Sequence, residues 1–171
     1  MTAPLPVEEK STLVMVYTQQ ALVRGTLMTR ESVRVSILLR TDGAPRFFHL
    51  HNAQMIFFGG GQVRSTNHSE IYVPTATVIA FHIVPPAQDP LDYEEGEKNR
   101  SVETVSAGVG TFVFKGNIRF SAQSGLASSL EMTHSWMSMY EVEVNNPSLP
   151  QMPTIQVPML LVDPKQVTFS L

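Results

Sequence analysis

Most of this chain consists of short runs in which apolar and polar residues alternate, and this period of two restricts it to β structure. In the first half the runs are rich in β-branched and aromatic residues, and they cover Thr12–Thr18, Ala21–Met28, Val33–Leu39, Phe47–Phe58 and Ile71–Val84. Turn-forming residues separate them at Thr41–Pro45, Gly59–Gly61 and Ser65–Ser69. Short strands at this spacing predict an all-β barrel or sandwich.

The alternation stops at an acidic, proline-containing stretch, Pro85–Arg100, which reads PPAQDPLDYEEGEKNR. Proline stiffness and like charges are typical of a linker, and the stretch has too few apolar residues to fold by itself. We therefore predict two domains, residues 1–86 and 104–171, joined by a linker at residues 87–103. The alternative is a long surface loop within a single domain, which is uncommon in compact folds.

Strand-like runs resume after this stretch, at Thr111–Phe120, Leu126–Met132, Ser138–Val144, Ile155–Val162 and Gln166–Leu171. Three features of the first half recur there in the same order. ALVRGTL, with Gly25, matches FVFKGNI, with Gly116; FHLHN (48–52) then falls on YEVEV (140–144), and the Val-Pro pair at Pro74 falls on the one at Pro158. The recurrence predicts an internal duplication.

The stretch LVMVYTQQALVRGTLMTRESVRVSILL resembles the Sm-like small barrel, whose first motif centres on a Gly-x-Leu in the second strand. The matching positions are Val14, Val16, Leu22, Gly25, Leu27 and Leu38. The resemblance spans Thr12–Val84 and, more weakly, Val105–Leu171. It implies two tandem, strongly bent five-stranded barrels and a tendency to form rings by pairing of edge strands. Gly25 and Gly116 would then mark the bend of the second strand, where a Cβ would crowd the neighbouring strand.

The chain departs from the family at the positions that contact RNA. Arg30–Glu31 and Val35–Ser36 stand where the family has its aspartate and asparagine, and prolines, Pro74 and Pro158, stand where it has Arg-Gly. Proline lacks the N–H that a strand ladder or a nucleotide could use, and in sheets it is confined to edges and bulges. The family's uridine pocket therefore does not carry over to this chain.

Two groups of residues remain as candidate binding sites. Arg24, Arg30, Arg34 and Arg40 make the first half locally basic, which favours nucleic-acid binding as an alternative function. The net charge of -3 argues against it, and the same arginines could instead complement acidic residues of the second half or of another subunit. Nucleic acid is therefore a possible partner but not the favoured one.

A second alternative is a barrel that binds a small ligand or a metal. His49 and His51 share one face of a predicted strand, His82 lies on the closing strand, and imidazole is a common ligand of transition metals. The competing interpretation is the solvent face of a half-buried strand. The alignment of the two halves supports that interpretation, because it places Glu141 and Glu143 at the corresponding positions.

The sequence contains neither cysteine nor a catalytic or cofactor motif, so we expect a non-enzymatic protein without a cofactor. The first ten residues lack a signal-peptide pattern, and no apolar run reaches the roughly 18 residues of a membrane helix. We expect a cytoplasmic protein with no membrane contact. The favoured function is that of a structural or interaction protein that forms homo-oligomers through exposed strand edges.

Overall fold

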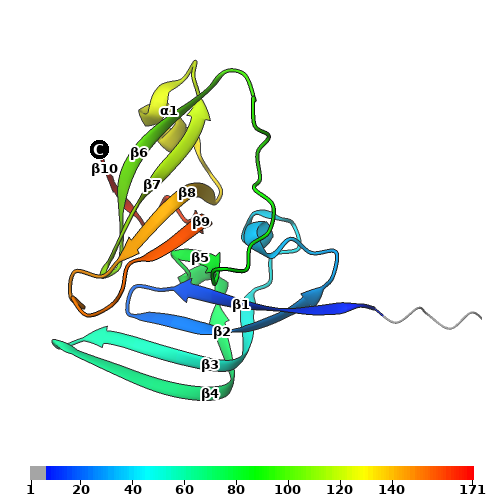
Figure 1. The fold of residues 1–171 in the computed structure, drawn as a ribbon, viewed down its shortest axis with the longest axis vertical. Helices are drawn as coiled ribbons and strands as arrows, with labels where there is room; N and C mark the ends of the chain where they lie inside the picture. The colour runs from blue at the N-terminus through cyan, green and yellow to red at the C-terminus, as the bar shows by residue number, and fades with distance from the viewer. Residues whose placement is uncertain (1–6) are drawn as a thin grey trace, which may run out of the picture.

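A computed structural model describes residues 7–171 and arranges them as one antiparallel sheet with little helix (Figure 1). Residues 1–6, which open the segment expected to lack a signal peptide, lie outside the described residues. Along the chain the elements are β1 (Glu9–Tyr17), β2 (Ala21–Arg30), the 3-10 helix η1 (Val35–Arg40), β3 (Phe47–Gly59), β4 (Gln62–Pro74), η2 (Thr75–Thr77), β5 (Ala80–Ile83), β6 (Arg100–Val109), β7 (Phe112–Ser121), α1 (Gly125–Met132), β8 (Met137–Asn145), β9 (Ile155–Val162) and β10 (Thr168–Ser170).

The ten strands neighbour one another in the order β10-β6-β7-β8-β9-β5-β1-β2-β3-β4. We call β1–β5 the first unit and β6–β10 the second unit. Within each unit the order is the same: the fifth strand lies beside the first, followed by the second, third and fourth. The two units meet where β9 pairs with β5, and the sheet is not closed, so that β4 and β10 are its edges. The all-β prediction is confirmed.

Each unit surrounds its own apolar core. One cluster holds residues of β1–β5 and η1, and the other holds residues of β6–β9. The two cores exchange a few side chains at the junction of the units. Tyr17, Leu22, Ile79 and Ala80 of the first unit are buried in the second core, and Leu161 of the second unit is buried in the first. The junction is therefore continuous with both cores.

The two glycines expected at the bends lie at corresponding irregularities of the sheet. The pairing of β2 with β3 shifts at Gly25, and the pairing of β7 with β8 shifts at Gly116. A Cβ at Gly25 would lie 2.9 Å from the Cβ of Leu50, and one at Gly116 would lie 2.9 Å from the carbonyl oxygen of Tyr140. Such approaches exclude any side chain without movement of the neighbouring strand.

The strands that face these glycines, β3 and β8, each contain one residue with positive φ, and these two residues give a different alignment of the two halves from the sequence. Asn52 in β3 and Glu141 in β8 both have positive φ, 47° and 51°. Matched in this way, His51 corresponds to Tyr140 rather than Glu143, so the sequence alignment is three residues out of register. The Val-Pro match fails for the same reason. Pro74 is the last residue of β4, whereas Pro158 lies within β9. The neighbours of Pro158 pair with Tyr140 and Val142, so Pro158 lies opposite Glu141, the residue that corresponds to Asn52.

Two predicted strands are helices. Val33–Leu39 contains most of η1, in which Val35, Leu38 and Leu39 are buried at the spacing of a helix face. Leu126–Met132 is the body of α1, whose Leu126 and Leu130 lie four residues apart and pack against the second core. No helix within residues 7–171 has both the length and the apolar composition needed to cross a membrane.

The bounds of other strands differ from the predicted ones because an exposed strand has no apolar face, and so no alternation of apolar and polar residues marks it. The predicted turn at Ser65–Ser69 is the middle of β4, where every residue from Gln62 to Glu70 is exposed. The predicted turn at Gly59–Gly61 is confirmed: it joins β3 to β4, and Gly60 and Gly61 have positive φ. Ile71–Val84 is divided by η2 into the end of β4 and β5. The end of the predicted linker, from Arg100 onward, is paired in β6.

Candidate functional site

The junction between the two units shows how a strand of one unit pairs with a strand of the other. It is a short antiparallel pairing in which Ala80 of β5 faces Val162 of β9 and Phe81 faces Leu161. All four residues are completely buried. The amide of Asp163 also donates to the carbonyl of Ile79 at 2.8 Å, which extends the ladder by one hydrogen bond. The chain thus contains a fully buried contact between the fourth strand of one unit and the fifth strand of the other.

At the two edges of the sheet, a fourth strand (β4) and a fifth strand (β10) each have an outer side that no strand of residues 7–171 pairs with. Strand pairing shows which of their residues correspond to those of the junction. Tyr17 pairs with Ala80 in the first unit, and Gly108, at the corresponding place in β6, pairs with Thr168. Thr168 therefore corresponds to Ala80, and the next residue, Phe169, corresponds to Phe81. One buried phenylalanine of the junction thus has a counterpart on the edge strand β10.

The fourth strands can be matched in the same way. His51 pairs with Glu70, and its counterpart Tyr140 pairs with Met159. Two residues further on, Tyr72 of β4 corresponds to Leu161 of β9. Leu161 is completely buried in the junction, whereas Tyr72 is 58 % exposed. The counterpart of a buried apolar residue is thus open to solvent on β4.

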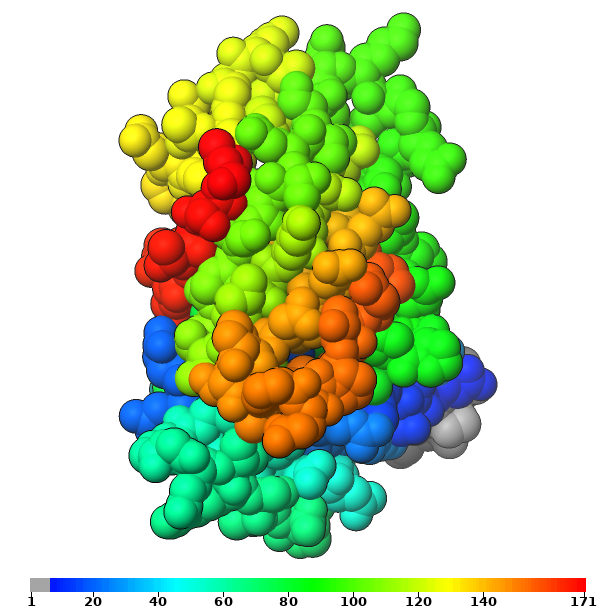
Figure 2. Space-filling model, turned by 60° about the vertical axis from the view of Figure 1, so that its left-hand side comes forward, coloured from blue at the N-terminus to red at the C-terminus, as the bar shows by residue number. Residues whose placement is uncertain are grey.

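The β4 and β10 edges form separate parts of the surface. In Figure 2 the C-terminal segment, in red, lies against the side of the second unit, and β3 and β4, in cyan to green, form the lower end of the molecule. Phe47 and Tyr72 are exposed near the β4 edge, and Val102 of β6 is exposed. Exposed apolar residues beside an unpaired strand are typical of a surface that another strand covers.

Two of the four arginines considered for nucleic-acid binding are engaged within the chain. Arg34 donates to the carbonyls of Pro90 and Leu91, at 2.6 and 3.2 Å. Arg40 forms an ion pair with Asp92, with Nη1 and Oδ2 2.7 Å apart. Arg24 and Arg30 are exposed on β2. The structure therefore does not gather the four guanidinium groups into one free basic surface.

These contacts fasten the predicted linker to the body of the protein. Besides Arg40, the carboxylate of Asp92 accepts hydrogen bonds from the hydroxyls of Ser138 and Tyr140, both at 2.6 Å. Burial raises the pKa of Asp92, but these hydrogen bonds and the Arg40 charge outweigh it, so that its pKa lies below the ordinary value. Burial, followed by the bond to Asp92, raises the pKa of Tyr140. Asp92 remains ionised and holds residues 85–99 in place.

Beside Asp92 lies an open cavity of about 470 Å³, between the fastened segment and the helical side of the second unit. Tyr93 stands at its wall, with the Arg119 guanidinium 3.8 Å from its ring centroid. Arg100 and Arg119 both pair with Glu97, and Trp136 also lines the cavity. Each arginine of this cavity thus lies beside a carboxylate, and Arg100 and Arg119 share that of Glu97.

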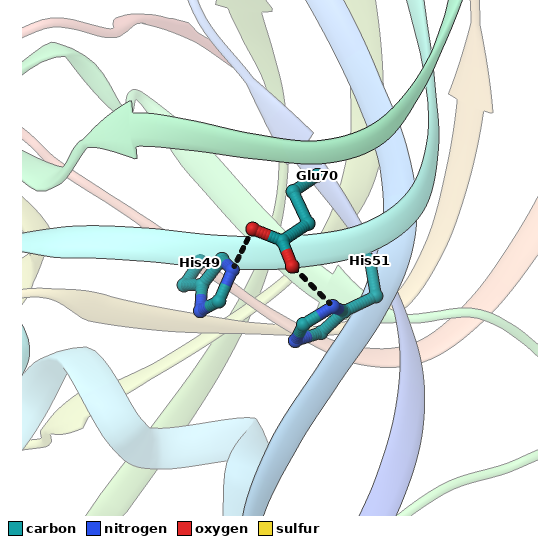
Figure 3. Close-up of side chains that lie close together, drawn as sticks. All are labelled: His49, His51 and Glu70. Atoms are coloured by element: carbon teal, nitrogen blue, oxygen red, sulfur yellow. Dashed lines mark ion pairs between the residues drawn. The ribbon is translucent and has the colours of Figure 1, made fainter.

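A second cluster lies on the first unit, where β3 and β4 pair (Figure 3). The Nε2 of His49 is 3.3 Å from Oε2 of Glu70, and the Nδ1 of His51 is 3.8 Å from Oε1 of the same carboxylate. One candidate ligand atom from each residue lies within 4.8 Å of the others. The strand period identifies the two histidines but not Glu70, because the sequence predicts a turn at Ser65–Ser69, where β4 in fact continues.

The third predicted ligand, His82, does not belong to this cluster. It lies on β5, which β1 and β2 separate from β3, and its side chain is buried. Its Nδ1–H donates to the carbonyl of Ile83 at 2.8 Å, which leaves Nε2 to accept a hydrogen bond from the Tyr17 hydroxyl at 2.9 Å. Burial, partly offset by the bond to Ile83, lowers the pKa of His82 from 6.5 to about 4. His82 is a neutral core residue, so the three-histidine site is wrong.

No family model, curated protein or solved structure matches this chain. What the chain itself offers is an internal strand junction, two edges that correspond to it, and a histidine–carboxylate cluster near one of those edges.

Proposed function

We propose that this protein is a non-enzymatic structural or interaction protein that assembles with copies of itself, the β4 edge of one copy pairing with the β10 edge of the next. In this proposal each unit is a strongly bent Sm-like small barrel, and the chain arose by duplication of one such unit. The support for duplication is the strand order shared by the two units and the corresponding bends at Gly25 and Gly116.

The observation that carries the proposal is the β9–β5 junction, because it is an intramolecular example of the contact proposed between copies. A fourth strand and a fifth strand pair there and bury their apolar residues. Residues 7–171 contain one further fourth strand, β4, and one further fifth strand, β10, and both lie at edges of the sheet. Unpaired N–H and C=O groups at a strand edge are a template for pairing with another chain, and β4 presents 13 residues of such an edge.

The junction also predicts the register of the contact. Phe81 faces Leu161 and Ala80 faces Val162. By correspondence, Phe169 of one copy would face Tyr72 of the next, and Thr168 would face Val73. The contact joins different surfaces of the two copies, so it is heterologous and generates either a closed ring or an open array.

Light scattering on the full chain tests the proposal. We expect a mass above the 19.0 kDa of a single chain. Tyr72→Lys places a charge at the centre of the predicted contact and should shift the mass toward that of a monomer. Val63→Lys is the matched control, because Val63 is 47 % exposed on the same strand but lies at its far end. This control should assemble like the unchanged protein.

A mixing experiment tests the heterologous geometry. Tyr72→Lys blocks the β4 edge and leaves β10 free, whereas Phe169→Lys blocks β10 and leaves β4 free. Neither variant alone should assemble, and an equimolar mixture should form a one-to-one pair. A strictly monomeric unchanged chain at high concentration, or equal masses for the Tyr72→Lys and Val63→Lys variants, would overturn the proposal.

A further inference from the structure

We propose that His49, His51 and Glu70 form a binding site for a divalent transition-metal cation of the zinc class. The proposal stands apart from self-association, because all three residues belong to one chain and the site needs no second copy. Two imidazoles and one carboxylate suit zinc and its neighbours in the first transition row, whereas magnesium and calcium prefer oxygen ligands only.

The spacing of the side chains is close to that of a coordination sphere. Bonds of about 2.0–2.2 Å at tetrahedral angles place ligand atoms roughly 3.3–3.6 Å apart. The distance from His49 to Glu70 is 3.3 Å, and that from His51 to Glu70 is 3.8 Å. The two imidazole centroids are 4.3 Å apart, and the rings are tilted by 50°. Small side-chain rotations would bring all three ligand atoms onto one ion.

One nitrogen of the cluster lacks a hydrogen bond. Nε2 of His49 is buried and makes none in the described part of the chain, although the carboxylate of Glu70 lies 3.3 Å away. A buried polar atom without a hydrogen-bond partner lowers the stability of the fold, so the missing partner of His49 Nε2 calls for an explanation. An ion between the imidazole and the carboxylate would satisfy both groups, since each would contribute a lone pair to it.

The strand scaffold holds the ligands in place before an ion arrives. His51 and Glu70 face one another directly across the β3–β4 pair, and His49 faces Tyr72. The His49 ring stacks on the Tyr72 ring with centroids 4.3 Å apart and planes 7° from parallel. Sites built on strands with packed side chains bind with less rearrangement than sites on loops.

The cluster is open to solvent on one side. The side chains of His49 and Glu70 are 38 % and 53 % exposed. An ion can therefore enter from water, and the three protein ligands leave a coordination position for a water molecule or for a group from a partner. A closed structural zinc site has four protein ligands, whereas three are typical of a site that exchanges its fourth ligand.

Calorimetric titration of the chelator-treated full chain with zinc chloride tests the proposal. We expect one zinc ion per chain. His49→Ala, His51→Ala and Glu70→Gln should each weaken binding by at least about tenfold, since even outer-shell partners of a metal site commonly contribute that much. Cobalt(II) in place of zinc should give the visible absorption of a tetrahedral centre with nitrogen and oxygen ligands.

His68→Ala is the matched control. His68 is exposed on the same strand two residues from Glu70, and its Nε2 bonds to the Thr66 hydroxyl at 2.9 Å. This variant should bind zinc like the unchanged protein. Circular dichroism and thermal unfolding without metal show whether the four variants remain folded, and Glu70→Gln, at an exposed position, preserves side-chain shape.

Three results would overturn the proposal: no zinc binding, equal binding by the unchanged chain and Glu70→Gln, or a loss of binding in His68→Ala as large as in His49→Ala. The first two would leave a histidine–glutamate ion pair as the whole role of the cluster. None of them bears on self-association, which is measured by mass without added metal.

Discussion

Replacing His82 by glutamine should remove a large part of the acid sensitivity of this protein. His82 is 1 % exposed and bonds to Tyr17 and to the carbonyl of Ile83 through a neutral ring. Its pKa falls from 6.5 to about 4 on folding, because burial disfavours the charged imidazolium. Glutamine keeps a polar side chain of similar reach at this position but does not titrate.

The size and sign of the effect follow from the two pKa values. Above pH 6.5 the ring is neutral in both states, so the free energy of unfolding does not depend on its protonation. Between pH 6.5 and about 4 the unfolded chain binds a proton that the folded chain does not, and stability falls by about 1.4 kcal/mol per pH unit. The loss amounts to about 3 kcal/mol and ends near pH 4.

Urea unfolding monitored by circular dichroism would measure this loss. The unchanged protein and His82→Gln are compared at pH 7.5, 6.5, 5.5 and 4.5. At neutral pH the variant should be less stable, by about 1–3 kcal/mol, because a glutamine amide cannot reproduce both buried hydrogen bonds of the imidazole, to Tyr17 and to Ile83. That difference should shrink steadily as the pH falls below 6.5. The titration of Asp92 interferes little, because its lowered pKa places its stability loss below pH 3.8.

A constant difference in unfolding free energy from pH 7.5 to 4.5 would refute this reasoning. So would an NMR titration of the folded protein in which the His82 ring gains its proton near pH 6.5. Either result would mean that the ring is not held neutral by the core, and that the acid response arises from other groups.

Further predictions concern the bends and the fastened segment. Gly116→Ala should destabilise the fold by about 1–3 kcal/mol in urea unfolding, because the new Cβ would lie 2.9 Å from the Tyr140 carbonyl oxygen. Gly108→Ala, whose Cβ would lie 3.7 Å or more from its neighbours, should change little, and equal losses would contradict the role of the bend. Asp92→Asn should cost about 1–3 kcal/mol and speed proteolysis within residues 85–99. Glu94→Gln, at an exposed position, should leave the proteolysis rate unchanged, and similar rates for the two variants would show that Asp92 does not hold the segment.

The sequence predicts strands that have one apolar and one polar face, and it misses strands whose two faces are both exposed and polar. β2 occupies Ala21–Arg30, against a prediction of Ala21–Met28, because its inward residues are apolar and one outward residue is Arg24. β4 is exposed over most of its length, so no alternation marks it. The sequence predicts a strand where η1 lies, because six residues are too few to separate a helical period from an alternating one.

The candidate site was predicted in part for the same reason. The pairing of His49 and His51 on one face follows from the strand period alone. Glu70 depends on which residue of β4 lies opposite His51. That pairing requires β4 to run unbroken from Gln62, whereas the sequence predicts a second turn at Ser65–Ser69. His82 could join the cluster only if the closing strand approached β3, whereas β5 lies between β1 and β9.

The exchange of side chains between the two cores has a consequence for how this chain can evolve. Leu161 completes the core of the first unit, and Tyr17, Leu22 and Ile79 complete that of the second. Neither unit could be deleted, swapped or released as a separate gene product without exposing an apolar surface that its sister now covers. If one ancestral unit was copied, the two copies now depend on each other for a complete core. A substitution in either unit is therefore selected for its effect on both.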